Sequence, residues 1–391
     1  MQARIAVIGG GAAGIAAARR LDRSGVEVLL LEASDRLGGR AHTVTRGGMA
    51  LDLGAGWLHS AEHNGWVGLA AEHGFTVDRT LPNWREQWRE LGFSPEERRA
   101  ANAAYEALDR RMRADPPASD RAADAIEPGS RWKPYLDALS GFINGAPTGE
   151  VSIADWLAYD DAATETDWRV AEGYGTLVTA HAAGLRVAPA TSVTAIDRTG
   201  TRLRIVTPRG NIETEAAIVT VSTNVLAGGA IDFGPGFDEV LHAAACLPLG
   251  LADKLFLALD GGEEIPANAH LLGNPHSAAT GTYTLRPFDR PVVEVMFGGE
   301  GARDGSGGAR GRRGLRDRRA LQAAGERLAQ AAAAGGGIGM EPRRPYPRRL
   351  QPCATGARRR TRRAGGTRRP TDTVRGRGLL ADGLLDRARS L

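Results

Sequence analysis

Four residues near the N-terminus have the types and spacing of a dinucleotide site. Gly9, Gly11 and Gly14 form a GxGxxG pattern, and Glu32 follows further along the chain. The first glycine permits a tight turn, the second lets the backbone approach a pyrophosphate, and the third allows close helix packing. A carboxylate in the place of Glu32 can accept hydrogen bonds from ribose hydroxyls, which argues against NADP. The pattern predicts a bound dinucleotide; the alternative is a glycine-rich turn without a ligand.

A strand–helix–strand unit is expected to position these residues. Ile5 to Ile8 is a short apolar run typical of a buried parallel strand. Ala12 to Ser24 is alanine-rich and predicts a helix, and Val26 to Leu31 predicts the next strand, which ends at Glu32. The N-terminus of such a helix directs free N–H groups and the positive end of its dipole toward a phosphate.

The residues after Glu32 distinguish FAD from NAD. Gly38, Gly39 and Arg40 follow it closely, and this GGR segment resembles the flavin-containing amine oxidoreductases, the family of monoamine and polyamine oxidases. In that family the arginine contacts the FAD pyrophosphate, whereas alone it would be an ordinary surface arginine. The resemblance covers residues 4–301. It implies FAD and an α/β fold, with a Rossmann-like doubly wound FAD-binding domain and an α+β substrate domain.

The resemblance continues along LDLGAGWLHS, which spans Leu51 to Ser60. In the family this segment passes along the flavin ring, and the small residues Gly54–Gly56 let the backbone touch it. Trp57 and His59 match a polyamine oxidase pattern in which the histidine borders the substrate channel. The alternatives are a core tryptophan and a loop histidine with its hydrogen bonds satisfied.

Lys254 stands out because lysine is rare in this chain. Of 50 basic residues, only Lys133 and Lys254 are lysines. The segment Leu247 to Leu257 resembles the place where polyamine-type flavin oxidases carry a lysine that holds a water against flavin N5. A compact ammonium suits that role better than the wide, permanently charged guanidinium. The alternative is a strand-end lysine whose amine reaches solvent.

The motifs and the family resemblance together predict which residues bind the cofactor and which take part in catalysis. The predicted cofactor-binding residues are Gly9, Gly11, Ala13, Gly14, Glu32, Arg40, Gly54, Ala55, Gly56, Trp57 and Val193. The predicted catalytic residues are Lys254 and His59, and no metal site is predicted. Val193 is included because the family uses a residue there for a backbone contact to adenine, and the alternative is a plain buried valine.

The chain is expected to alternate between cofactor and substrate segments. Apolar residues at three-to-four spacing predict helices over Val67–His73, Pro95–Met112 and Pro134–Asn144, and strands are expected at Thr282–Leu285 and Pro291–Phe297. The FAD-binding domain is predicted to consist of residues 1–65 and 181–235. The substrate domain is predicted to consist of a mainly helical part, 66–180, and a sheet part, 236–301, and residues 302–391 form the tail.

The tail differs from the rest of the chain in charge and composition. Residues 302–391 hold 23 Arg, no Lys and 7 acidic residues, so the chain's net charge of +4 divides into +16 there and −12 elsewhere. Family motifs expected in this region are absent from the sequence. Three interpretations remain open: a basic tail that binds nucleic acid, a partly helical extension over Leu315–Ala334, or translation in a shifted frame, which we favour.

Cysteine usage and hydropathy indicate the compartment. The chain has two cysteines, no disulfide framework, no leader before the first strand and no apolar run of membrane length. A cytoplasmic protein is therefore expected.

The resemblance implies an FAD-dependent amine oxidase. A neutral amine would transfer a hydride from its α-carbon to flavin N5, the imine would hydrolyse, and O2 would be reduced to H2O2. The expected partners are a small-molecule amine and O2, without a membrane and with nucleic acid disfavoured; no oligomeric state is indicated. Two alternatives stay open: another FAD oxidoreductase of this fold, such as a desaturase or protoporphyrinogen-type oxidase, or an inactive flavoprotein remnant with a basic tail.

Overall fold

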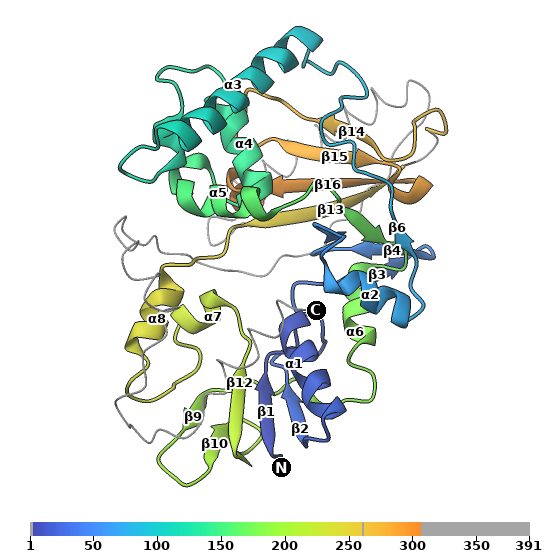
Figure 1. Ribbon diagram of the computed structural model, residues 1–391. Coiled ribbons are helices and arrows are strands. Elements are labelled where there is room, and N and C mark those ends of the chain that lie inside the picture. The colour runs from blue at the N-terminus through green and yellow to red at the C-terminus, as the bar shows by residue number, and fades with distance from the viewer. Residues whose placement is uncertain (1–2, 260–261, 306–391) are drawn as a thin grey trace. The chain divides into compact units, whose positions relative to one another are not determined.

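The computed structural model describes residues 3–259 and 262–305 (Figure 1). Within them the chain forms two compact units, each assembled from separate stretches of sequence. Unit 1 comprises the described parts of Met1–His42 and Tyr174–Pro248, and unit 2 comprises Thr43–Gly173 and the described chain from Leu249 onward. Apart from residues 302–305, the predicted tail lies outside the described part of the chain, and so do its three interpretations.

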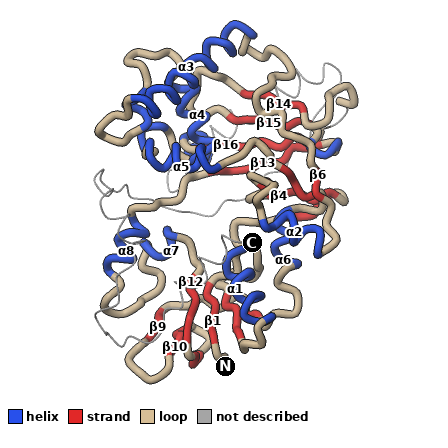
Figure 2. Tube along the Cα trace, in the orientation of Figure 1, coloured by secondary structure: helices blue, strands red, loops and turns tan. Residues whose placement is uncertain are grey.

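A four-stranded parallel sheet forms the centre of unit 1 (Figure 2). Its order is β12 (Ala216–Val219), β1 (Ile5–Ile8), β2 (Val28–Leu31) and β8 (Val187–Ala188). Every residue of β1 and β2 is buried, as expected where both faces of a parallel sheet are covered. β2 begins at Val28, two residues later than predicted, because the Val26 N–H still bonds to the Leu21 carbonyl in the turn after the preceding helix.

Helix α1 (Ala12–Arg23) packs on this sheet through its buried small residues, which include Gly14 and Ala18. The predicted helix is confirmed almost to the residue.

A second, antiparallel sheet consists of β9 (Ala195–Asp197), β10 (Leu203–Val206) and β11 (Ile212–Thr214). Three more helices complete the described part of unit 1: α6 (Tyr174–Ala180), α7 (Thr223–Ala227) and α8 (Asp238–Ala245).

Unit 2 is built on a four-stranded antiparallel sheet. Its order is β13 (Ala252–Ala258), β16 (Val292–Gly298), β15 (Gly281–Leu285) and β14 (Ala269–Leu272). Side chains alternate along β15, where Tyr283 and Leu285 are buried between half-buried neighbours. The predicted strands near residues 282–285 and 291–297 are confirmed as β15 and β16.

Helices α3 (Pro95–Ala114), α4 (Lys133–Asn144) and α5 (Ile153–Ala162) group together in unit 2, and α4 packs on β16 (Figure 1). α3 begins with a reciprocal cap, because the Ser94 hydroxyl accepts the Glu97 N–H while the Glu97 carboxylate accepts the Ser94 N–H. Together with α2 (Gly65–Glu72), α3 and α4 confirm the predicted helices; α5 was not singled out.

Short strands in unit 2 complete the framework of its pocket. β3 (Thr43–Arg46) and β4 (Met49–Asp52) form a hairpin whose turn residues, Gly47 and Gly48, both have positive φ. β7 (Trp168–Val170) lies between β5 (Trp57–Leu58) and β6 (Val77–Asp78). The last described helix, α9 (Glu300–Gly305), follows β16. Three short 3₁₀ turns are also present: η1 (Ala122–Ala125), η2 (Thr148–Glu150) and η3 (Pro287–Asp289).

Candidate active site

The glycine pattern of unit 1 forms an open cradle at the start of α1. Gly9 has φ of 112°, and a Cβ on Gly14 would lie 1.8 Å from the Gly9 carbonyl oxygen. A Cβ on Gly11 would meet only the Cα of Gly39, at 4.0 Å. Gly11 is the N-cap and supplies no side chain to the first N–H groups of the helix. These donors and the open space beside them fit a pyrophosphate.

Glu32 is fixed at the end of β2, beside this cradle. Its Oε2 accepts the Gly10 N–H at 2.6 Å, and its Oε1 accepts the Ser34 N–H at 2.8 Å and the Ser34 hydroxyl at 2.7 Å. A carboxylate has about four acceptor positions, so one remains for a ribose hydroxyl. The residues present therefore fit the adenosine end of a dinucleotide.

The GGR segment lies against the same glycines. The Gly38 N–H bonds to the Gly10 carbonyl at 2.8 Å, and both Gly38 and Gly39 have positive φ. Arg36, which the sequence did not single out, donates to the Gly39 carbonyl at 3.0 Å and so holds this turn. Arg40 is exposed, as is Ala13, whereas Val193 is buried in the core of unit 1. Contacts of these three residues with FAD remain predictions.

Gly14→Ala is expected to abolish FAD retention. The added methyl would overlap backbone of Gly9, which cannot rotate away, so α1 would move off β1 and the phosphate cradle would open. Gly200→Ala is the matched control in unit 1, because a Cβ there meets no atom closer than 3.5 Å. The measurement is flavin absorbance of the purified protein after gel filtration. Normal FAD content in Gly14→Ala would contradict the assignment.

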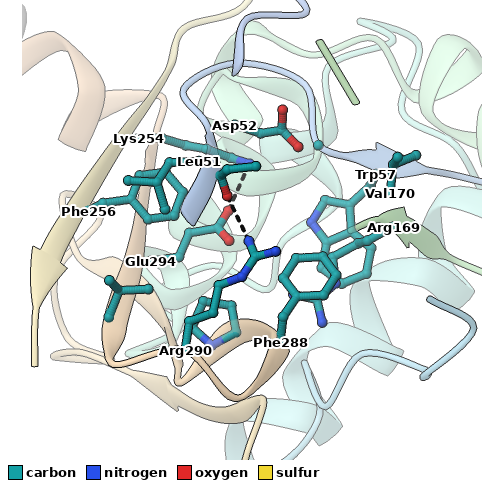
Figure 3. Close-up of a pocket in the computed structure, with 14 residues that line it drawn as sticks. Leu51, Asp52, Trp57, Arg169, Val170, Lys254, Phe256, Phe288, Arg290 and Glu294 are labelled. Atoms are coloured by element: carbon teal, nitrogen blue, oxygen red, sulfur yellow. Dashed lines mark hydrogen bonds and ion pairs between the residues drawn. The ribbon is translucent and has the colours of Figure 1, made fainter. Parts of the chain in front are cut away.

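Unit 2 contains a small pocket where three cationic side chains meet aromatic rings (Figure 3). Its cavity volume is about 20 Å³, which suffices for one or two water-sized groups. Charged residues in its lining are Asp52, Arg169, Lys254, Arg290 and Glu294, and the rings are those of Trp57, Phe256 and Phe288. The pocket brings together Gly56, Trp57 and Lys254 from the predicted site.

Lys254 forms a largely buried ion pair with Glu294. Its Nζ lies 2.7 Å from Glu294 Oε1, and the two side chains are 11% and 14% exposed. The pair spans the adjacent strands β13 and β16, in which Phe256 is the direct partner of Glu294. A Cβ on Gly56 would come within 3.2 Å of Lys254 Nζ, so the glycine leaves room for the ammonium. Lys254 is thus an inward-facing lysine and does not extend into solvent.

His59 does not line this pocket but has a partner of its own. Its Nδ1 lies 2.8 Å from Oδ1 of Asp167, whose side chain is 11% exposed while that of His59 is 51% exposed. A carboxylate at Nδ1 selects the tautomer in which Nδ1 carries the proton and Nε2 can accept one. Trp84 packs against His59 and, edge to face, against Trp57.

Arg290 is held by the backbone of other segments. Its Nη1 and Nη2 each donate to a carbonyl at 2.7 Å, those of Ala50 and Ala171, and its guanidinium stacks on Phe288. Burial lowers the pKa of Arg290, while the negative charges of Asp52 and Glu172 act in the opposite direction.

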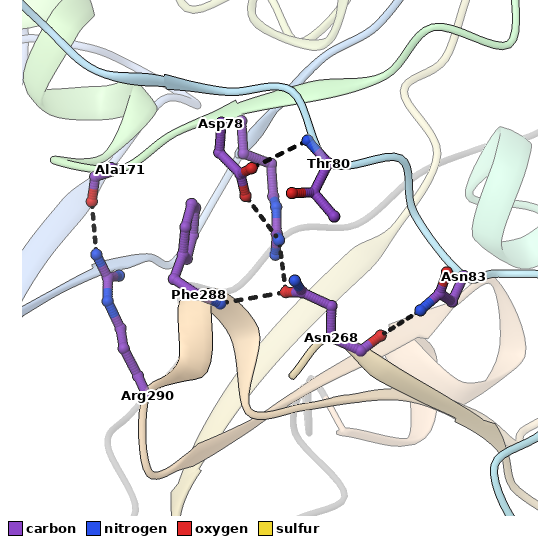
Figure 4. Close-up of polar contacts among 8 residues, drawn as sticks. Asp78, Thr80, Asn83, Ala171, Asn268, Phe288 and Arg290 are labelled. Atoms are coloured by element: carbon purple, nitrogen blue, oxygen red, sulfur yellow. Dashed lines mark hydrogen bonds and ion pairs between the residues drawn. The ribbon is translucent and has the colours of Figure 1, made fainter. Parts of the chain in front are cut away.

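Arg169 lies in β7, the middle strand of the three-stranded sheet. Its Nη2 donates to Asn268 Oδ1 at 2.6 Å and lies 3.3 Å from Asp78 Oδ2. Asn268 also accepts the Phe288 N–H at 3.1 Å (Figure 4). The guanidinium packs against the rings of Trp57 and Phe288, at 4.8 and 4.2 Å from their centres. Burial lowers the pKa of Arg169, and the charges of Asp78 and Glu294 oppose that shift.

Sequence reasoning missed several residues of this site. Glu294 could have been identified from the sequence as a candidate site residue, because it is the single charge in the apolar strand PVVEVMF. No sequence pattern identifies the other three, Arg169, Arg290 and Asp167, because their hydrogen-bond partners come from segments far away in sequence.

Known proteins resemble this chain in sequence and in fold. The family model of flavin containing amine oxidoreductases matches residues 12–305. Polyamine oxidase 4 of Oryza sativa subsp. japonica is 27% identical over 77% of this chain and 68% of its own length. Polyamine oxidase 2 of Arabidopsis thaliana is 28% identical over 65% of this chain, and the match spans 58% of that relative.

Solved structures show the same fold. A putrescine oxidase bound to putrescine superposes with a TM-score of 0.59 at 18% identity, covering 80% of this chain and 79% of that one. A double mutant of putrescine oxidase gives a TM-score of 0.60 at 17% identity, covering 84% and 81%. The fold is therefore that of an FAD-binding domain combined with a substrate domain.

The chain belongs to the flavin-containing amine oxidoreductase family. The family, fold class and FAD cofactor predicted from the sequence are confirmed. Among the described residues, no helix combines the length and apolar character needed to cross a bilayer.

Proposed function

We propose that this chain oxidises a small-molecule amine, with FAD as the first electron acceptor and O2 as the final one. When bound, FAD supplies the two-electron acceptor that the protein's own side chains lack. The observation that carries the proposal is the buried Lys254–Glu294 pair beside Gly56. The amine oxidase names of the relatives support the same class of reaction.

Lys254 is proposed to hold a water in the pocket. Its ammonium has three N–H donors and Glu294 takes one, so two remain for a water. Glu294 restricts the ammonium to one direction, because a buried ion pair with good geometry has few alternative arrangements.

His59 is proposed to take the proton of the substrate ammonium, since only a neutral amine can be oxidised at its α-carbon. Asp167 accepts a hydrogen bond from Nδ1–H, which leaves Nε2 able to receive a proton, and its negative charge stabilises the resulting imidazolium. Trp84 places apolar surface beside the imidazole and packs against Trp57, and the two rings would exclude water from the substrate's carbon chain.

The test uses the purified full chain loaded with FAD. Under anaerobic conditions an amine substrate should bleach the flavin absorbance, and in air it should produce equal amounts of H2O2 and the carbonyl product, an aldehyde from a primary amine or a keto acid from an α-amino acid. The panel includes monoamines, diamines, polyamines and amino-carboxylates, with FAD-free protein as the control. Bound FAD that no amine reduces would refute amine oxidation and favour another reaction of the same fold or an inactive flavoprotein.

A further inference from the structure

Arg169 has unused hydrogen-bonding capacity in a buried place. The residue is 4% exposed, yet its Nε and Nη1 have no hydrogen-bond partner within the part of the chain that the structure describes. Buried guanidinium nitrogens are normally paired, because an unpaired buried charge loses its hydration without compensation. Such a group indicates a ligand or a water that completes its hydrogen bonds.

Residues from the two neighbouring strands and from η3 hold this guanidinium in place. Across the β5–β7 ladder its direct partner is Trp57, and across the β6–β7 ladder it is Asp78. Phe288 covers the guanidinium from η3. Because the rings of Trp57 and Phe288 pack against the guanidinium, its unpartnered N–H donors are the groups that a ligand would contact.

The charge balance of the pocket favours an anion. Glu294 neutralises Lys254, and Asp78 lies at the longer distance of 3.3 Å from one nitrogen of Arg169. Among described residues, no carboxylate lies within ion-pair distance of Arg290, whose hydrogen bonds go to backbone carbonyls. The lining itself holds three cations and only two acids, Asp52 and Glu294, so it carries one net positive charge, which disfavours the second ammonium of a diamine.

We propose that Arg169 binds a carboxylate of the substrate, so that the amines oxidised here are amino-carboxylates rather than polyamines. This inference rests on the proposed function. The cavity of about 20 Å³ has room for a terminal group the size of one or two waters, such as a carboxylate. Carboxylate oxygens are the natural partners of guanidinium N–H groups, and the aromatic walls strengthen the attraction by excluding water.

Binding without turnover gives the first test. Butyrate, which has no amine to oxidise, is titrated by calorimetry into the full chain loaded with FAD, and butyramide serves as its neutral analogue. Butyrate should bind and butyramide should not. Arg169→Met should weaken butyrate binding about 10- to 100-fold, the range for a lost charge-assisted hydrogen bond. Arg85→Met is the matched control, because Arg85 is 88% exposed and pairs with Glu165 on the surface of the same unit.

Turnover gives the second test. Each α- and ω-amino acid of a short-chain series is compared with the amine that lacks its carboxylate and with the diamine of equal length. The best amino acid should have a KM at least about 10-fold below those of its two counterparts. Arg169→Met should remove that difference by raising the KM of the amino acid alone.

The outcomes separate this inference from the proposed function. Arg169-dependent butyrate binding without amine oxidation would refute the function and retain the carboxylate site. Amine oxidation with equal butyrate affinity in wild type and Arg169→Met would refute the carboxylate site alone. If Arg169→Met does not fold, Arg169→Lys keeps the charge but loses the fork of donors, and unchanged butyrate affinity there would overturn the inference. Loss of FAD from either folded variant would also overturn it, by assigning Arg169 to the cofactor.

Discussion

Lys254→Met should slow amine oxidation by about 100-fold or more while FAD stays bound, because positioned proton and water handling contributes factors of this size. Methionine is unbranched and of similar length, so it fills the same space beside Gly56. It cannot hold a water with N–H donors. The measurement is the rate of flavin bleaching by an amine in the absence of O2, together with H2O2 formation in air.

The single substitution has a second effect that must be separated from the first. It leaves the Glu294 carboxylate, 14% exposed, without its cation, and breaking a buried pair from one side typically costs about 3–5 kcal/mol. The double variant Lys254→Met with Glu294→Gln removes both charges and should recover most of the lost stability. Its oxidation rate should stay as low as that of the single variant.

Lys254→Arg provides the complementary control. It keeps a positive charge near Glu294, but the planar guanidinium is too wide for the space that Gly56 leaves around Nζ. We expect this variant to be folded and slow. Oxidation at a rate near wild type in Lys254→Met would show that the lysine is a structural partner of Glu294 only.

The nucleotide end of the site could be predicted because it is local in sequence. Gly9, Gly14 and Glu32 lie within one strand–helix–strand unit, whose geometry follows from short-range rules of turn, helix and strand. The hydrogen bonds from Gly10 and Ser34 to Glu32 come from neighbours along the chain or across that turn. Few alternative arrangements of these residues exist, so their spacing within the strand–helix–strand pattern was sufficient to predict the site.

The pocket of unit 2 could not be predicted in the same way. Arg169 acquires its surroundings through the register of β5 with β7 and of β6 with β7, in which a shift by one residue would turn its side chain to the other face. Asn268 and Phe288 arrive from still more distant segments. A single sequence contains no local pattern that fixes such pairings. Lys254 was identified from its rarity and a family resemblance, and its partner Glu294 only emerges from the pairing of β13 with β16.

Gly298→Ala should destabilise unit 2 by about 3 kcal/mol, the upper end of the usual cost of overpacking. A Cβ on Gly298 would lie 2.0 Å from the carbonyl oxygen of Gly141 and 2.7 Å from the amide nitrogen of Phe142. These are backbone atoms of α4, so no side chain can rotate to relieve the overlap. The helix would have to move away from β16, which exposes part of the core beneath it.

Urea denaturation of the FAD-loaded chain measures this effect as a lower midpoint. Gly149→Ala is the matched control in unit 2, because a Cβ there meets no atom within 4 Å and the residue does not have positive φ. Gly298 lies on the same strand as Glu294, so displacement of α4 should also disturb the ion pair with Lys254 and lower the oxidation rate of the protein that remains folded. A variant with a wild-type midpoint would show that α4 can shift on β16 at little cost. A lower midpoint with a wild-type oxidation rate would show instead that the strand holds Glu294 independently of the helix packed against it.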